Sequence, residues 1–230
     1  MSIDPPAERH RPIRSYVLRS GRLTDSQRKA IDDHWSRWVV PTADTQLDLA
    51  ALFPQQGKLV IEIGFGMGDS LLAMAVQEPS TNFIGIEVHR PGVGKLLHGI
   101  AEQQVANLKI ICRDATEVLL HCFQANTIDK IQIFFPDPWP KKKHQKRRIV
   151  QPEFMGLLRD RLRSGGQIHL ATDWQEYADY MLEVMEAVPG MRNGEGAGNF
   201  WEHPLRPDTK FENRGKRLGH GVWDLLYVKT

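Results

Sequence analysis

The sequence predicts an α/β protein with a mostly parallel sheet and helices on both faces. From Lys58 onward, short apolar segments of strand length alternate with helical patterns, which is typical of strand–helix–strand crossover units. The first apolar segment runs directly into a glycine-rich turn that a helical pattern follows. No repeat, low-complexity segment or Pro/Gly/Ser-rich linker interrupts residues 58–187. We therefore predict a single domain.

The individual elements follow from the positions of the apolar residues. The expected strands are Leu59–Ile63, Phe83–Val88, Leu108–Cys112, Ile131–Phe135, Gln167–Thr172 and Val222–Val228. The expected helices are Asp69–Gln77, Pro91–Gln104, Ala115–Cys122, Pro152–Arg163 and Trp174–Ala187. The Gly/Asn-rich stretch 189–199 is expected to be a loop, and residues 200–230 to return a last strand to the sheet.

The first 45 residues are predicted to form a basic N-terminal extension, which leaves residues 46–230 as the single domain. Arginines outnumber carboxylates in this part of the chain. Thr24 and Gln27 have the spacing of a capping box, which predicts a helix from Asp25 to about Trp38. The composition fits an arm that touches a polyanion and a solvated tail equally well.

Composition and targeting signals limit the class of protein. The 230 residues are 41% hydrophobic and 25% charged, with a net charge of +2, so affinity for a polyanion has to come from local clusters of charge. The N-terminus lacks the apolar core of a signal peptide, and no apolar run approaches ~18 residues. Cys112 and Cys122 have no C-x-x-C spacing, which favours free thiols and a cytoplasmic location. The nine histidines show no metal-ligand spacing, and the oligomeric state, monomer or homodimer, stays open.

The glycine turn after the first strand is the first candidate binding site. Gly64, Gly66 and Gly68 alternate with other residues, and a helix follows at Asp69, a context that favours close approach of a ligand to the backbone. A dinucleotide-binding turn needs a third glycine at position 69, where Asp69 would repel a pyrophosphate. Glu62 and the G-x-G-x-G spacing instead resemble motif I of class I S-adenosylmethionine-dependent methyltransferases. A cationic cofactor suits such an acidic pocket.

Four successive strands are expected to end near a carboxylate, namely Glu62, Glu87, Asp114 and Asp137. In an open α/β sheet these strand ends flank the ligand crevice. Glu87 can accept both hydroxyls of an adenosine ribose, or be a surface residue. Asp114 can accept a hydrogen bond from adenine, cap the following helix, or do both. Together the four carboxylates are a stronger cofactor signal than any one of them.

The strand 131–135 stops at Pro136-Asp137-Pro138, so a carboxylate is delivered to the sheet edge on a stiff backbone. Six cations follow within the eight positions 141–148. This proximity indicates chemistry on a polyanion. Trp139 can stack on an extruded base or pack against Phe134.

The segment 136–148, PDPWPKKKHQKRR, resembles the signature of tRNA (guanine-N7-)-methyltransferases. Further matching motifs occur in the expected order over most of the chain: RSYVLRSGRL at 14–23, the turn 62–68, TDW at 172–174, TKFE at 209–212 and RLGHGVWD at 217–224. The resemblance implies a Rossmann-like class I methyltransferase fold, with residues 46–230 as a single methyltransferase domain. It also implies S-adenosyl-L-methionine as cofactor, tRNA as partner, and methyl transfer to N7 of a guanosine in the variable loop.

The resemblance also implies roles for residues beyond the cofactor turn. Substrate contacts are implied for Lys141, Asp173, Thr209, Lys210, Phe211 and Glu212, and RNA contacts for Lys143, His144, Gln145, Lys146, Arg147 and Arg148. Lys143 departs from the arginine expected in most relatives, which replaces a planar contact by a point charge. Asp173 fits a helix N-cap equally well, and basic runs are often solvated surfaces.

The chemistry of guanine N7 agrees with these roles. N7 is a bare lone-pair acceptor, so no general base is formally required, and the task is to hold it in line with the methyl group. Asp137 is the candidate catalytic residue, because a fixed carboxylate stabilises positive charge that develops on the purine. The same carboxylate can read the guanine N1–H and amino group.

Two other functions are compatible with parts of the sequence. Pro-Asp-Pro-Trp loosely resembles the Asn-Pro-Pro-aromatic motif of enzymes that methylate exocyclic amines. A non-catalytic RNA-binding subunit could retain the same fold without turnover, although the intact Glu62, Gly64–Gly68 and Asp137 disfavour it.

Overall fold

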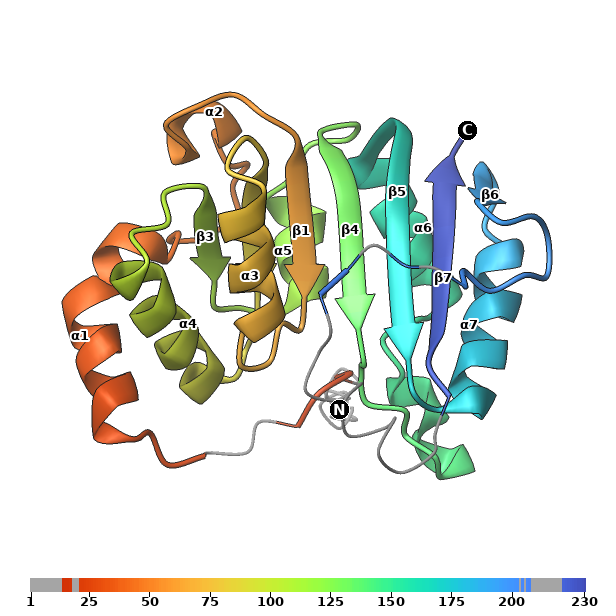
Figure 1. The fold of residues 1–230 in the computed structure, drawn as a ribbon. Helices are drawn as coiled ribbons and strands as arrows, with labels where there is room; N and C mark the ends of the chain where they lie inside the picture. The colour runs from red at the N-terminus through yellow and green to blue at the C-terminus, as the bar shows by residue number, and fades with distance from the viewer. Residues whose placement is uncertain (1–13, 18–20, 203, 205, 208–220) are drawn as a thin grey trace, which may run out of the picture.

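The structure is a computed structural model that describes residues 14–17, 21–202, 204, 206–207 and 221–230. Within these residues, seven strands form one sheet in the order β3-β2-β1-β4-β5-β7-β6. Strands β1 to β5 pair in parallel, and β7 runs antiparallel between β5 and β6. Figure 1 shows this sheet with helices on both sides. The α/β prediction and the returning last strand are confirmed.

Most observed bounds are close to the predicted ones, but two strands begin several residues earlier than predicted. Strand β4 begins at Ile128 and not at Ile131, and β5 begins at Leu162 and not at Gln167, so the predicted helix to Arg163 is two residues too long. The strands are β1 Leu59–Ile63, β2 Asn82–Ile86, β3 Leu108–Ile111, β4 Ile128–Phe134, β5 Leu162–Thr172, β6 Met191–Asn193 and β7 Trp223–Lys229. The helices are α1 Asp25–Trp38, α2 Leu49–Leu52, α3 Asp69–Gln77, α4 Arg90–Glu102, α5 Ala115–His121, α6 Pro152–Arg161 and α7 Gln175–Glu186, with a 3₁₀-helix η1 over Lys142–Arg147. Helix α2, η1 and strand β6 were not predicted.

Two apolar layers hold the helices onto the sheet. One layer joins α5, α6 and α7 to the sheet through residues such as Val118, Met155 and Met181. The other joins α1, α3 and α4 through residues such as Ile31, Leu71 and Leu97. Because the parallel strands are covered on both faces, their sequences are nearly continuous apolar runs, and all five residues of β1 and of β2 are buried.

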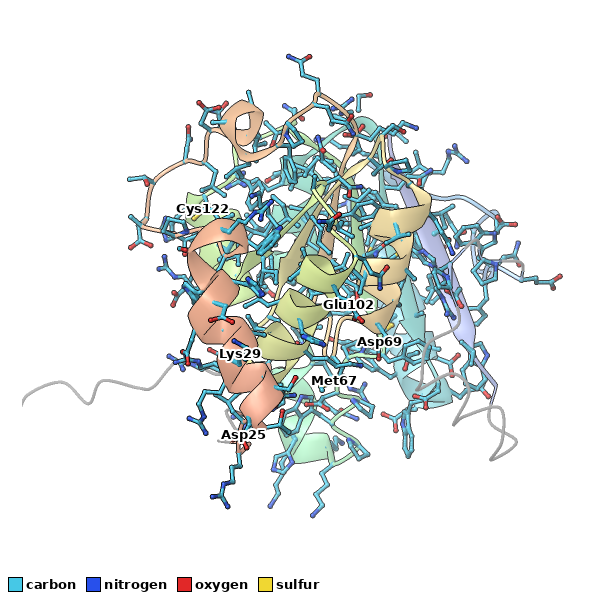
Figure 2. The ribbon with its side chains drawn as sticks, turned by 60° about the vertical axis from the view of Figure 1, so that its left-hand side comes forward. Asp25, Lys29, Met67, Asp69, Glu102 and Cys122 are labelled. Atoms are coloured by element: carbon cyan, nitrogen blue, oxygen red, sulfur yellow. The ribbon has the colours of Figure 1, made fainter. Side chains whose placement is uncertain are left out.

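Helix α1 belongs to this core, although its residues were assigned to a basic extension. Its capping box is present as predicted, because the Thr24 side chain accepts from the Gln27 N–H and the Gln27 side chain accepts from the Thr24 N–H. Ala30 and Ile31 are buried against α4. Figure 2 shows the two helices side by side, with Lys29 labelled on α1. The arginine-rich composition concealed this apolar face.

The order of the strands defines where a ligand can bind. Strand β1 pairs with β2 on one side and with β4 on the other, so the chain winds outward in two directions from the gap between β1 and β4. In open α/β sheets the ligand crevice lies at the carboxyl ends of the strands at this reversal point. In Figure 1 these are the arrowheads of β1 and β4.

Other sequence-based expectations concern the membrane and the cysteines. In the part of the chain that the structure describes, no helix has the length and apolar character needed to cross a bilayer. Both cysteines are free thiols, with Cys122 buried and Cys112 half-buried.

Candidate active site

The glycine turn between β1 and α3 forms one wall of the site. Gly64, Gly66 and Gly68 have φ angles of +74°, +57° and +77°, a region that favours glycine. No atom of the described part of the chain lies within 4 Å of a Cβ built on Gly64 or Gly66, so these residues face open space there. A Cβ on Gly68 would lie 2.9 Å from the side chain of Leu96, so this glycine is needed for packing between α3 and α4.

The open space beside the turn is a cavity of about 610 Å³, within the ~300–1,000 Å³ usual for small-molecule sites. Its lining includes the ends of β1, β2 and β4. Among the sequence-predicted residues, the lining contains Glu62, Gly64, Gly66, Gly68, Glu87 and Asp137. The structure therefore brings most of the predicted cofactor residues around one cavity.

The Glu87 carboxylate joins the glycine turn to the end of β2 through hydrogen bonds. One oxygen accepts from the Gly66 N–H at 2.9 Å, and the other accepts from the Val88 and His89 N–H groups at 2.7 and 2.9 Å. A carboxylate can accept about four hydrogen bonds, so these three leave capacity for one ligand hydroxyl. Glu87 thus lines the cavity and fixes the glycine turn at the same time.

Glu62 is a buried carboxylate in the cavity lining. Burial raises its pKa to about 7, although a 2.9 Å hydrogen bond from the Gln132 amide acts in the opposite direction. Gln132 is fully buried on β4, and its amide oxygen has no hydrogen-bond partner among the described residues. A desolvated carboxylate in this position favours a cationic group, because attraction between opposite charges is strong at low dielectric.

Asp114 is the N-cap of α5, where its carboxylate accepts from the Thr116 and Glu117 N–H groups at 2.9 and 3.4 Å. The helix-cap reading is confirmed, and the contact with adenine stays a prediction. Burial first, and then the Asp114 carboxylate, raise the pKa of the Tyr16 phenol. Ser15 and Tyr16 both line the cavity. Both residues belong to the motif at 14–23, but no role at the cavity was predicted for them, because the residues of this segment do not indicate where it folds back.

The loop after β4 places Asp137 at the cavity, with its side chain exposed. Two bulky residues flank it in the left-handed region, Phe135 at φ +51° and Trp139 at φ +44°. The Trp139 indole N–H donates to the Ser15 carbonyl at 3.3 Å, and the Arg147 guanidinium lies 5.1 Å from the indole ring. The loop is therefore held from the N-terminal segment and from η1.

Packing against Phe134 was one of the two predictions for Trp139, and the ring of Phe134 instead contacts His169 and Arg206. The Phe134 ring meets His169 edge-on at 4.8 Å, and the Arg206 guanidinium lies 5.6 Å from it. Arg206 also lies over the Phe135 ring at 5.3 Å and forms two 2.8 Å hydrogen bonds to Asp224. The next residue along the chain, Pro207, lines the cavity. These contacts bring Arg206 and Pro207 to the site.

The basic run 141–148 has both exposed and buried side chains. Lys141, Lys142, Lys143 and Lys146 are exposed, whereas His144, Gln145 and Arg147 are half-buried. Arg148 is 3% exposed, which contradicts the expectation that its side chain faces RNA together with the others. Figure 1 shows this part of the chain beyond the arrowheads of β4 and β5.

The remaining predicted substrate residues lie in two other segments. Asp173 follows β5 and precedes Trp174, which is the N-cap of α7 and makes no side-chain cap hydrogen bond. The N-cap interpretation of Asp173 is therefore wrong. Thr209, Lys210, Phe211 and Glu212 lie outside the described residues.

The cavity chemistry fits S-adenosylmethionine. Four carboxylates line it, namely Glu62, Asp69, Glu87 and Asp137. Glu62 and Glu87 lie beside the glycine turn, where no atom of the described residues is within 4 Å of a Cβ built on Gly64 or Gly66. Because the cavity lies at the reversal point of a sheet in the order 3-2-1-4-5-7-6, fold and site together define a class I S-adenosylmethionine-dependent methyltransferase.

Comparisons with known proteins identify the family. Residues 56–225 match a family model described as "putative methyltransferase". A Pseudomonas putida tRNA (guanine-N(7)-)-methyltransferase is 51% identical over 99% of this chain and 95% of its own length. The enzyme of that name from Saccharophagus degradans is 49% identical over 98% of this chain and 99% of its own length. The chain belongs to the tRNA (guanine-N(7)-)-methyltransferase family.

Solved structures support the fold at lower sequence identity. The 16S rRNA methyltransferase KamB superimposes with a TM-score of 0.59 at 16% identity, covering 84% of this chain and 99% of KamB. The antibiotic-resistance methyltransferase Kmr gives 0.55 at 13% identity, covering 83% and 94%. These similarities concern the fold alone.

Proposed function

We propose that the protein transfers a methyl group from S-adenosyl-L-methionine to N7 of a guanosine in the variable loop of tRNA, forming 7-methylguanosine. The observation that carries the proposal is the position of Asp137. Its exposed carboxylate lies at the mouth of a cavity lined by Glu62 and Glu87, and four exposed lysines follow within nine residues. The names of the relatives agree with this reaction.

The cofactor supplies an electrophilic methyl group on a positively charged sulfur. The carboxylate of Glu62 provides negative charge for the cationic cofactor, and Glu87 provides an acceptor for a hydroxyl. Guanine N7 has no proton to lose, so the residues around it need to orient the base rather than deprotonate it. In this proposal the Asp137 carboxylate stabilises the positive charge that develops on the purine. One electrostatic contact of this kind contributes ~3 kcal/mol to transition-state stabilisation.

The RNA is held by its phosphates in this proposal. Lys141, Lys143 and Lys146 are exposed and can contact phosphates as point charges. Asp173 and the segment 209–212 are proposed as further substrate contacts. Because tRNA is the proposed substrate, the proposal includes a cytoplasmic location.

The product of the reaction provides the test. Purified protein is incubated with methyl-labelled cofactor and an unmodified tRNA transcript, and the digested nucleosides are separated by chromatography. We expect labelled 7-methylguanosine from the transcript that carries a guanosine in the variable loop. A transcript with adenosine at that position, or with 7-deazaguanosine, should accept no label, because neither offers the guanine N7.

Other products would identify the alternative functions. Label in an N2-methylguanosine would mean that an exocyclic amine is the acceptor. If titration calorimetry detected tRNA binding and no cofactor binding, the chain would be an RNA-binding subunit without turnover.

A further inference from the structure

Arg148 differs from the other cations of the basic run in its surroundings. Its side chain is 2% exposed, whereas Lys142, Lys143 and Lys146 are exposed. The 3₁₀-helix η1 ends at Arg147, and the Arg148 N–H donates to the Gln145 carbonyl at 2.9 Å. This turn directs the Arg148 side chain inward, beneath the segment that carries the lysines.

The guanidinium of Arg148 is enclosed by specific partners. Its Nε–H donates to the Pro138 carbonyl at 2.9 Å, and Nη2 donates to the Glu176 carboxylate at 2.8 Å. The rings of Tyr177 and Tyr180 lie 4.8 and 5.1 Å from its central carbon. A buried cation is costly unless it is paired and hydrogen-bonded, and these contacts use the planar donor geometry that lysine lacks.

The carbonyl that Arg148 binds belongs to the residue directly after Asp137. The loop is strained on both sides, because Phe135 and Trp139 have φ angles of +51° and +44°. Bulky residues in this region cost roughly 1–3 kcal/mol each, so the conformation persists only where surrounding contacts impose it. The hydrogen bond from Arg148 to the Pro138 carbonyl is such a contact, and it joins the loop to α7 through Glu176.

We infer that Arg148 is a positioning residue, which holds the 135–139 loop so that Asp137 stays at the mouth of the cavity, and that it does not bind RNA. The inference rests on the proposed role of Asp137 in methyl transfer. The basic run then has two functions: its exposed lysines bind RNA, and its buried arginine fixes the position of the 135–139 loop. Displacement of a catalytic group by 1 Å can reduce the rate by ~100-fold without loss of substrate affinity.

The test compares R148K with K146A, a matched substitution at an exposed cation of the same run. For R148K we expect kcat at saturating tRNA to fall at least ~10-fold, while the tRNA Kd and its salt dependence stay within twofold of wild type. For K146A we expect the opposite division, with a weaker Kd and a smaller salt slope as the main effects, and a smaller fall in kcat than in R148K. Cofactor binding by calorimetry verifies that both variants are folded.

A second variant, E176A, keeps the proposal testable if R148K does not fold. In E176A the arginine stays and one of its partners is lost, so kcat should fall less than in R148K, again with an unchanged tRNA Kd. If R148K weakened tRNA binding and reduced the salt slope as K146A does, the positioning role would be wrong. If the proposed function itself were wrong, the wild-type protein would yield no 7-methylguanosine, so this failure differs from a failure of the Arg148 inference.

Discussion

Asp137 is the residue on which the proposed chemistry depends most. Replacement by Asn keeps its size and removes the negative charge, so we expect kcat to fall ~10²–10³-fold, the usual cost of losing one transition-state electrostatic contact. Affinity for tRNA should change less than threefold, because the phosphates and not Asp137 carry most of the binding energy. Single-turnover kinetics and filter binding measure the two quantities. The matched control is D160N, at an exposed side chain of α6. If D137N lost rate and tRNA affinity equally, Asp137 would only bind the substrate and would not stabilise the transition state.

Glu62 gives cofactor binding a defined pH dependence. Its pKa is about 7 because the carboxyl is buried, so near neutral pH part of the free protein carries an uncharged Glu62. A cationic ligand favours the ionised form, and binding therefore releases a proton. We expect the cofactor affinity to rise by up to ~10-fold per pH unit below 7 and to level off above it. Calorimetry from pH 5.5 to 8.5 tests this, with E62Q as a control that should bind weakly and lack this pH-dependent component.

Single residues differ in how far their roles can be predicted from the sequence. Glu62 and Glu87 were predictable because a strand end fixes the position of its own residues. The buried state of Arg148 was not predictable, because its environment comes from Tyr177 and Tyr180 on α7, which lie 29 and 32 residues further along the chain. The same applies to Tyr16, which reaches the cavity from a segment with no strand or helix to locate it. Roles that depend on distant packing partners need the three-dimensional structure.

At the scale of elements, the glycine turn is supported by helix α4. A Cβ on Gly92, at the start of α4, would lie 1.8 Å from the Gly66 carbonyl oxygen, far inside van der Waals contact. We therefore expect G92A to displace the turn and weaken cofactor binding by at least ~10-fold, with a lower melting temperature. The control is G156A in α6, where a Cβ would have no atom of the described residues within 4 Å. It should leave cofactor affinity unchanged and stabilise the protein by ~0.5–1 kcal/mol. Cofactor binding of G92A equal to that of wild type would refute the close contact.

The basic 3₁₀-helix η1 is expected to supply the salt-dependent part of tRNA affinity. Lys142, Lys143 and Lys146 are exposed on it. If each neutralises one phosphate, the slope of log K against log salt should lose about 0.7–0.9 per lysine removed. We expect the triple alanine variant to bind tRNA more weakly with a slope smaller by about 2–3. The control K29A, on the outer surface of α1, should leave the salt slope unchanged. If the triple variant also had the wild-type slope, the RNA-binding surface would lie elsewhere.

The elements that the sequence predicted well have a strong local signal. Strand β1 and helices α1 and α3 have the predicted bounds, because an apolar run, a capping box and a glycine turn mark their ends. Strand β6, over Met191–Asn193, is short and pairs with β7, so its pairing depends on a strand about thirty residues away. Helix α2 has a single turn, and η1 is so polar that its sequence resembles a solvated loop. Short elements with distant partners are those that local patterns miss.

At the scale of the whole molecule, polar groups form a buried layer between β1, β4, β5 and β7. Glu62 receives a hydrogen bond from Gln132, and His169 lies 2.7 Å from Asp224, to which Arg206 also binds. In the register of the sheet, Gln132 on β4 is directly opposite His169 on β5. The two buried groups Glu62 and His169 are therefore parts of one layer that extends from the cofactor cavity to the last strand.

These two groups respond to pH in opposite directions. Burial lowers the pKa of His169 to about 4, so between pH 4 and 6.5 the unfolded chain binds the additional proton, and stability rises with pH. Burial raises the pKa of Glu62 from 4.5 to about 7, so between these values the folded protein binds the additional proton, and stability falls as pH rises. Each contribution amounts to at most ~1.4 kcal/mol per pH unit. From pH 4.5 to 6.5 the two slopes should largely cancel in the wild-type protein.

Replacement of either group should reveal the slope of the other. We expect the free energy of unfolding of E62Q, relative to wild type, to gain up to ~1.4 kcal/mol per unit of rising pH between 4.5 and 6.5, and that of H169Q to lose a similar amount. Urea unfolding of the three proteins at intervals of half a pH unit measures these differences, and the subtraction removes groups common to all three. If H169Q had the same pH dependence as wild type, His169 would be titrating normally, and the buried layer could not be as closed to water as its contacts indicate.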